Sequence, residues 1–200
     1  MAWAPDYCTA SELKSYLGIG DTVDDVELAL AITAASRAVD QATGRQFGAT
    51  ATTEARTYVP TWDRRRSLYV IDLDDLMTVT GLGFVDENGT ALAALVTLGD
   101  GGYRLEPLNA AQEGRPWTRA VTATAATEWT VTATWGWSAV PDTVKKATLL
   151  QANRFHKRRS SPFGVAGSPD LGSEMRLLAK VDPDVDLMLS SFRRWWAARS

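Results

Sequence analysis

The amino-acid sequence predicts an α+β protein in which a helical bundle core carries an inserted small antiparallel β domain. The first observation is that helix-capping signals and helical periodicity occur near both ends of the 200-residue chain. The second is that its middle consists of short runs of β-branched and aromatic residues. We therefore expect residues 1–55 and 138–200 to form the helical core, from N-terminal helices, a long central helix and a C-terminal helix. Residues 56–137 should form the β domain.

The composition is that of an ordinary globular chain, and it excludes several kinds of site. Apolar residues make up 45% of the sequence and the formal net charge is -3, which argues against a surface that binds nucleic acid everywhere. Cys8 is the only cysteine and His156 the only histidine, so an internal disulfide is impossible and a Cys/His zinc site is not expected. No apolar run reaches about eighteen residues, so we expect a soluble protein that is made in the cytoplasm and does not enter membranes.

Two helices are predicted before the β domain. Thr9 and Glu12 have the spacing of a capping box, and Gly18 favours a helix end, which predicts a helix over residues 10–17. A second helix of about twenty residues should follow, because acidic residues suit its N-terminal end and Gly44 suits its C-terminal end.

The second predicted helix has two apolar faces. Its main apolar stripe consists of Leu28, Ile32, Ala35, Val39 and Ala42. Val26 and Leu30 lie on the opposite side of the helix. The helix is therefore either buried between two neighbours within its own domain or in contact with another subunit through one face.

Turn signals separate the strands of the predicted β domain. Asn88-Gly89 is typical of a type I′ hairpin turn, and residues 99–102 indicate another tight connection. In the last run, apolar residues alternate with Glu and Thr, which predicts one buried and one exposed face. These apolar residues are Trp129, Val131, Ala133 and Trp135.

A long helix should return the chain to the helical core. It is expected to begin at Pro141 and to end near Arg159, before a loop at residues 160–167. Its apolar face consists of Val144, Ala147, Thr148, Ala152 and Phe155, flanked by Leu149 and Leu150. Its polar face consists of Lys146, Asn153 and Lys157. The polar face is either simply solvated or, when repeated around a ring, weakly attractive to a phosphate backbone.

A short amphipathic helix is predicted near the C-terminal end of the chain. Asp182 is suited to cap it, and Pro183 suits its first turn. Its apolar arc consists of Val185, Met188, Leu189, Phe192, Trp195 and Trp196. This arc either folds back onto its own domain or docks in the groove of a partner, where aromatic residues and arginine contribute most of the binding energy.

The sequence offers little catalytic chemistry. It contains no phosphate-binding loop, no complete dinucleotide fingerprint and no nucleophile elbow. The cluster of Asp72, Asp74 and Asp75 does not have the spacing of a calcium loop and is better explained by a turn at the end of a strand. Residues 63–66, Asp-Arg-Arg-Arg, are interpreted as a solvated turn, with a phosphate-attracting tip as the alternative. We therefore expect a protein that is not an enzyme and holds no metal and no cofactor.

Several characteristic segments follow one another over nearly the whole chain. They are YCTASELKSYLGI, DDVELALAITAASRAVDQATGRQF, LDDLMTVTGL, YRLEPLN, GRPW, WGWSAVPDTVKKATLLQANRFHKRRSSPFGVAG and DPDVDLMLSSFRR. Together they resemble the gp6-like family of phage head-tail connector, or adaptor, proteins of tailed double-stranded DNA phages. The smaller members of that family are almost wholly helical, so the β domain departs from their pattern.

The resemblance implies a structural virion protein without enzymatic activity. Such a protein assembles as a ring of twelve copies below the portal protein at one capsid vertex, and DNA passes through the central channel. It joins the portal to the stopper or tail-completion protein, so its expected location is the head-tail neck of the virion, after assembly in the host cytoplasm. Its contacts with double-stranded DNA are expected to be non-specific.

The implied roles fall on three sets of residues. The portal-binding residues are expected to be Val185, Met188, Leu189, Phe192, Arg193, Arg194, Trp195 and Trp196. The expected subunit interface consists of Val26, Leu30, Leu149, Leu150 and Phe163. The expected lining of the DNA channel consists of Lys146, Asn153 and Lys157.

A different function class stays open, that of a non-enzymatic binding module. In that hypothesis the Trp-rich β domain binds carbohydrate or another surface. It requires the rings of Trp117, Trp135 or Trp137 to be exposed and coplanar.

Overall fold

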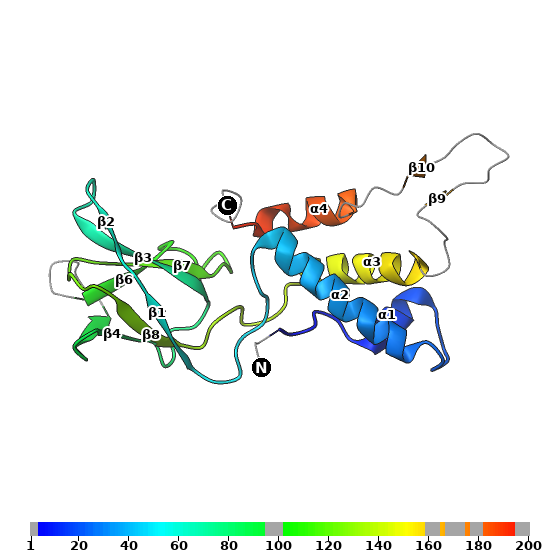
Figure 1. Ribbon diagram of the computed structural model, residues 1–200, viewed down its shortest axis with the longest axis horizontal. Helices are drawn as coiled ribbons and strands as arrows, with labels where there is room; N and C mark the ends of the chain where they lie inside the picture. Colours follow the sequence, from blue (N-terminus) through cyan, green and yellow to red (C-terminus); the bar gives the residue numbers. More distant parts are fainter. Residues whose placement is uncertain (1–3, 95–101, 159–164, 167–174, 177–181, 195–200) are drawn as a thin grey trace. The chain divides into compact units, whose positions relative to one another are not determined.

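The structure is a computed structural model that describes residues 4–94, 102–158, 165–166, 175–176 and 182–194. The chain divides into two compact units. One unit comprises Met1–Phe47 and Val140–Ser200 and is helical, and the other comprises Gly48–Ala139 and is built of β-strands (Figure 1).

The helical unit contains four α-helices and a final turn of 3-10 helix in its described part. They are α1 (Ala10–Leu17), α2 (Asp25–Thr43), α3 (Asp142–Arg158), α4 (Pro183–Leu189) and η3 (Ser190–Phe192). The predicted capping box of α1 is confirmed, because the Thr9 N–H donates to Glu12 Oε2 at 2.8 Å and the Glu12 N–H donates to Thr9 Oγ1 at 3.2 Å. Gly18 and Gly44 end α1 and α2 with φ values of 71° and 64°, a conformation that suits glycine.

The helices pack around a core of aliphatic side chains. α3 contacts α1, α2 and α4, so it lies at the centre of the helical unit. The buried core cluster consists of Cys8, Leu13, Leu28, Ala31, Ile32, Ala35 and Ala152. The predicted main stripe of α2 therefore faces inward, and its small alanines let α3 approach closely.

The β unit is a single eight-stranded sheet that curls around its own core (Figure 1). Its strands are β1 (Glu54–Tyr58), β2 (Thr61–Asp63), β3 (Leu68–Leu76), β4 (Gly83–Asp86), β5 (Ala91–Ala94), β6 (Gly102–Glu106), β7 (Trp117–Thr122) and β8 (Trp129–Ala133). Their order in the sheet is β1-β8-β4-β5-β6-β7-β3-β2, and β5 and β6 pair in parallel. The short strands β9 (Val165–Ala166) and β10 (Met175–Arg176) pair with each other separately.

The core of the β unit confirms the predicted alternation in its last strand. Trp129, Val131 and Ala133 are buried, whereas the intervening threonines are half-buried. Trp135 continues the buried face, and its indole N–H donates to the Glu54 carbonyl at 2.8 Å.

The entry and exit of the β unit are hydrogen-bonded to each other. The Trp137 N–H donates to the Gly48 carbonyl at 2.9 Å, and the Thr50 N–H donates to the Trp135 carbonyl at 2.9 Å. The two ends of this unit therefore lie side by side, although they are far apart in the sequence.

The predicted architecture, a helical bundle core with a small inserted antiparallel β domain, is wrong. The β part is a mixed eight-stranded sheet that forms a compact unit of its own, and α1 and α4 are short helices of 8 and 7 residues. The error has a physical cause. A run of β-branched residues predicts a strand locally, but the size of a sheet depends on pairings between distant strands, such as β1 with β8.

Candidate functional site

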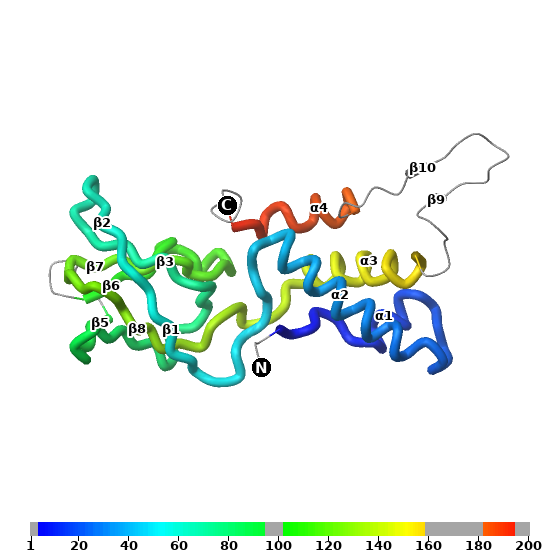
Figure 2. Tube along the Cα trace, viewed as in Figure 1, coloured from blue at the N-terminus to red at the C-terminus, as the bar shows by residue number. Residues whose placement is uncertain are grey.

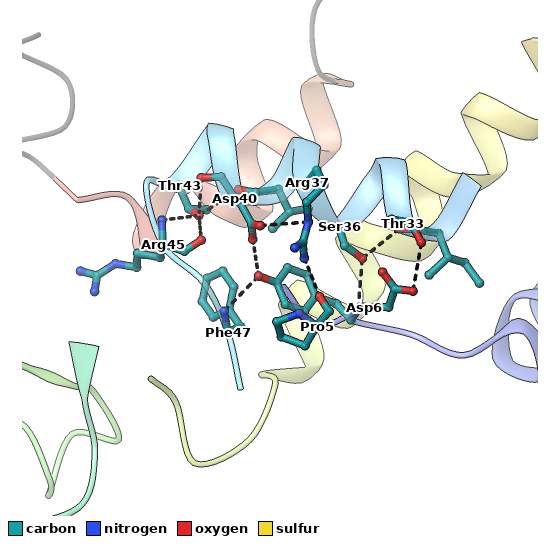
Figure 3. Close-up of polar contacts among 12 residues, drawn as sticks. Pro5, Asp6, Thr33, Ser36, Arg37, Asp40, Thr43, Arg45 and Phe47 are labelled. Atoms are coloured by element: carbon teal, nitrogen blue, oxygen red, sulfur yellow. Dashed lines mark hydrogen bonds and ion pairs between the residues drawn. The ribbon is translucent and has the colours of Figure 1, made fainter. Parts of the chain in front are cut away.

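The segment before α1 is bound to α2 by polar contacts (Figure 3). The Tyr7 N–H donates to Ser36 Oγ at 3.1 Å, and the Tyr7 hydroxyl donates to the Asp40 carboxylate. Arg37 donates to the Pro5 carbonyl at 2.5 Å. Burial raises the pKa of Tyr7, and the hydrogen bond to Asp40 raises it further. These contacts attach the segment before α1 to the C-terminal half of α2.

The chain after α4 is attached to the C-terminal end of α2. The Arg45 Nε–H donates to the Phe192 carbonyl at 2.6 Å, and the Arg194 N–H donates to the Thr43 carbonyl at 2.9 Å. The Phe192 ring meets the Phe47 ring edge-on, with 5.6 Å between centroids. The described C-terminal end is therefore held in place by both backbone and aromatic contacts.

The predicted portal-binding residues divide between a buried and an exposed side of α4. Val185 and Leu189 are buried in a helix that packs on α3 and α2, as in the fold-back alternative. Met188 and Phe192 are half-buried, Arg193 is exposed and forms an ion pair with Asp186, and Arg194 is buried. Trp195 and Trp196 lie outside the described residues.

An exposed leucine on α4 was not anticipated. The Leu187 side chain is 76% exposed, on the side of α4 away from the helical core. Helical periodicity directs attention to the apolar arc, and Leu187 lies outside that arc.

The predicted subunit-interface residues differ in exposure. Val26 and Leu30 are 75% and 66% exposed on α2, and Val23, just before the helix, is 86% exposed. We call Val23, Val26 and Leu30 the α2 stripe. Leu149 and Leu150 are half-buried, and Leu149 packs against the helical core. Phe163 lies outside the described residues.

Two of the three predicted channel-lining residues on α3 are exposed. Lys146 and Lys157 are exposed and form no ion pair among the described residues. The Lys146 ammonium lies 4.2 Å from the centroid of the Tyr16 ring, a cation–π contact. Asn153 is half-buried, and its Oδ1 is buried without a hydrogen-bond partner in the described part of the chain.

The three tryptophans named in the carbohydrate-binding hypothesis do not form an exposed platform. Trp135 and Trp137 are buried, and Trp117 is half-buried against the core. Of the predicted acidic cluster on β3, Asp72 pairs with Arg119 at 2.8 Å, whereas the Asp75 carboxylate accepts the Trp137 indole N–H at 2.8 Å. No group of three metal-binding side chains occurs within the described ranges, and no described helix is long and apolar enough to cross a membrane.

Comparison with known proteins finds a similar fold but no matching family model or curated protein. The chain matches no family model and no curated protein. Its structure is similar to a chain in the solved structure described as "Neck of empty GTA particle computed with C6 symmetry", with a TM-score of 0.55 and 21% sequence identity. The similarity covers 96% of this chain and 93% of that chain, so it includes both units. At this identity the likeness establishes a shared fold.

Proposed function

We propose that this chain is a structural neck protein of a phage-like particle, a head-to-tail adaptor that forms a ring around a channel for DNA. The observation that carries the proposal is the fold similarity to a chain from the neck of a GTA particle over 96% of this sequence. The sequence resemblance to head-tail connectors supports the same role from different data. In this proposal the chain is located in the virion neck and has no catalytic activity.

The α2 stripe supports assembly into a ring. Three large apolar side chains exposed in a row are unfavourable in water, and a neighbouring copy would cover them. A ring uses head-to-tail contacts, in which one face of a subunit meets a different face of the next. The C6 symmetry of the similar particle neck is compatible with a ring of twelve copies, because such a ring contains a sixfold axis.

The C-terminal end supports contact with the portal protein. Leu187, Met188 and Arg193 offer apolar and cationic groups on the accessible side of α4 and η3, while the buried Val185 and Leu189 hold that helix in place. We assign portal contact to the accessible side and to residues 195–196. The opposite end of the ring would meet the stopper or tail-completion protein.

The exposed lysines of α3 support a channel that attracts DNA only weakly. The positive charges of the exposed Lys146 and Lys157 would attract the phosphate backbone of DNA whatever its base sequence. The formal net charge of -3 limits this attraction, which suits DNA that must move through the channel.

Electron microscopy of the purified protein mixed with its portal tests this function. We expect a ring bound coaxially to the portal, and native mass spectrometry should give its copy number. Val26→Asp should prevent ring formation, because it buries an unpaired carboxylate at the apolar contact. Ser11→Asp, which adds the same charge at an exposed position of α1, should assemble normally. A protein that stays monomeric with its portal and leaves no density at the neck would overturn the proposal.

A further inference from the structure

The hairpin formed by β2 and β3 stands at one edge of the β unit and extends away from it (Figure 2). β2 has β3 as its only neighbour in the sheet, with Trp62 opposite Tyr69 and Asp63 opposite Leu68. The same part of β3 also pairs with β7, at Tyr69 and Val70, so the hairpin forms the edge of the sheet. Its tip consists of residues 63–67.

The backbone of this tip is held in one conformation by its own residues. Asp63 Oδ1 accepts the N–H groups of Arg65 and Arg66 at 2.9 and 3.3 Å. Ser67 has a φ of 52°, in the left-handed region that a serine rarely adopts, and this residue closes the turn. The Arg66 guanidinium binds both carboxylate oxygens of Glu106 on β6. The tip is thus fixed in shape and anchored to the sheet.

Two arginines at the tip differ from every other cationic side chain of the β unit. Between residues 48 and 139 the sequence contains seven arginines and no lysine. Five of them pair with carboxylates: Arg56 with Asp74, Arg66 and Arg104 with Glu106, Arg115 with Glu113, and Arg119 with Asp72. Arg64 and Arg65 are exposed and have no carboxylate partner among the described residues. Within the described part of the chain, these two adjacent guanidinium groups therefore have no counterion.

An exposed aromatic residue precedes these arginines in the sequence. The Trp62 side chain belongs to an exposed residue, with 47% of its surface accessible, and its ring centroid is 4.8 Å from that of Tyr69. The Tyr69 ring supports one part of the indole, and the remainder faces solvent. The tip thus combines fixed backbone, free positive charge and an accessible apolar surface.

We infer that the tip of the β2–β3 hairpin binds the phosphate backbone of double-stranded DNA without sequence preference, through Arg64 and Arg65. Arginine matches phosphate geometry with two parallel hydrogen bonds, and an unpaired arginine has no internal ion pair to break first.

This inference deepens the proposed function, on which it rests for its biological partner. An acidic protein surface would also attract guanidinium groups. DNA is favoured because its phosphates repeat at short intervals along the backbone. Two neighbouring arginines therefore meet two neighbouring phosphates wherever the tip contacts the duplex. A single chain binds weakly through two contacts, and a ring of copies multiplies them.

Nuclear magnetic resonance of the ¹⁵N-labelled full chain, titrated with a short mixed-sequence duplex at low salt, tests the inference. We expect the largest shifts at the Trp62 indole N–H and at the amides of Arg64 and Arg65. The double variant Arg64→Gln/Arg65→Gln should lose these shifts. It should also reduce the slope of log K against log salt by about 1.8, since each phosphate contact contributes about 0.9.

A matched control removes two charges elsewhere on the same unit. Arg115→Gln/Arg119→Gln changes the net charge equally, and both residues are exposed and paired with carboxylates. This variant should bind the duplex like the parent chain. Equal loss of binding in both double variants would overturn the inference, because net charge would then explain the binding.

Three further results separate this inference from the alternatives. Stronger shifts at the tip with poly-glutamate than with the duplex would overturn it in favour of an acidic protein surface. Ring assembly on the portal without duplex shifts at the tip would contradict this inference and leave the proposed function intact. Duplex shifts at the tip of a chain that never forms a ring would support the inference and contradict the proposed function.

Discussion

Glu106 is the carboxylate that holds the β2–β3 hairpin against the sheet. It accepts hydrogen bonds from Arg66 and from Arg104, the latter at 3.0 Å. The hydrogen bond from Arg66 is the main cause of a lowered pKa of Glu106, and the contact with Arg104 adds to it. A lowered pKa means that the folded protein favours the ionised form of this side chain.

Acid should therefore loosen the hairpin before it unfolds the chain. The stabilisation from Glu106 is present above the ordinary glutamate pKa of about 4.3 and is lost as the pH falls through the lowered value in the folded state. Hydrogen exchange at the amides of residues 64–67, corrected for intrinsic rates, should increase over that range. Glu106→Gln should remove this pH dependence, whereas Glu113→Gln, at a more exposed pair, should preserve it. Protection that stays constant across the range would contradict this account.

Single residues show where sequence patterns are sufficient and where they are not. Helical spacing correctly put Val26 and Leu30 on the side of α2 opposite its buried stripe. The same reasoning cannot find the hydrogen bond between Tyr7 and Asp40, because it joins residues 33 positions apart. It also missed Val23, which precedes the helix and has no place in its periodicity.

At the scale of elements, local chemistry predicted the ends of helices and of one hairpin. The α1 capping box and the glycine ends of α1 and α2 are confirmed. Asn88-Gly89 does connect two antiparallel strands, β4 and β5. The predicted type I′ turn is wrong, because of the two residues only Gly89 has a positive φ, of 83°. These features depend on residues that are close in the sequence, which is why the sequence specifies them.

Strand pairing was the part that local chemistry could not supply. β1 pairs with β8, and β5 pairs in parallel with β6. Neither pairing can be predicted from a few consecutive residues of the sequence. The sheet was therefore expected to be smaller and purely antiparallel. By contrast, the turn predicted at residues 63–66, solvated or with a phosphate-attracting tip, needs no distant pairing, and residues 64–67 do form an exposed turn between β2 and β3.

The two sides of α4 have different roles. The buried side stabilises the helical unit, and the accessible side is the one proposed to contact the portal. Leu189→Ala should lower the free energy of unfolding by about 2–5 kcal/mol, because it leaves a cavity in the helical core. Leu187→Ala should change it by less than about 0.5 kcal/mol, because that side chain is already exposed. Urea denaturation measures both values.

The same pair of variants tests the proposed portal contact. Leu187→Ala should weaken binding of the purified chain to its portal although the fold is unchanged. If Leu189→Ala weakens portal binding and Leu187→Ala does not, the affinity follows stability alone. That result would argue against contact through the accessible side of α4.

At the scale of the whole molecule, each unit has a hydrophobic core of its own. The β core includes the large side chains Trp129, Trp135 and Phe84. The helical unit buries an alanine-rich cluster and, in addition, the rings of Tyr7 and Phe47. No residue of either cluster belongs to the other unit. Each core therefore stabilises its unit by burying that unit's own side chains.

Residues 48–139 should accordingly fold as an isolated fragment. We expect dispersed amide and indole resonances and a cooperative thermal transition, because the buried tryptophans and the sheet pairings are all internal to this unit. Trp129→Ala in the fragment should lower its stability by about 3–5 kcal/mol or prevent folding. A fragment that remains unfolded would mean that the helical unit contributes to the stability of the sheet.

The hydrogen bonds between Gly48 and Trp137 and between Thr50 and Trp135 have a consequence for evolution. They bring both ends of the β unit to one place, so the unit is an insertion whose entry and exit strands lie side by side. Related genes can lengthen, shorten or exchange such a segment as a cassette without altering the backbone of the recipient.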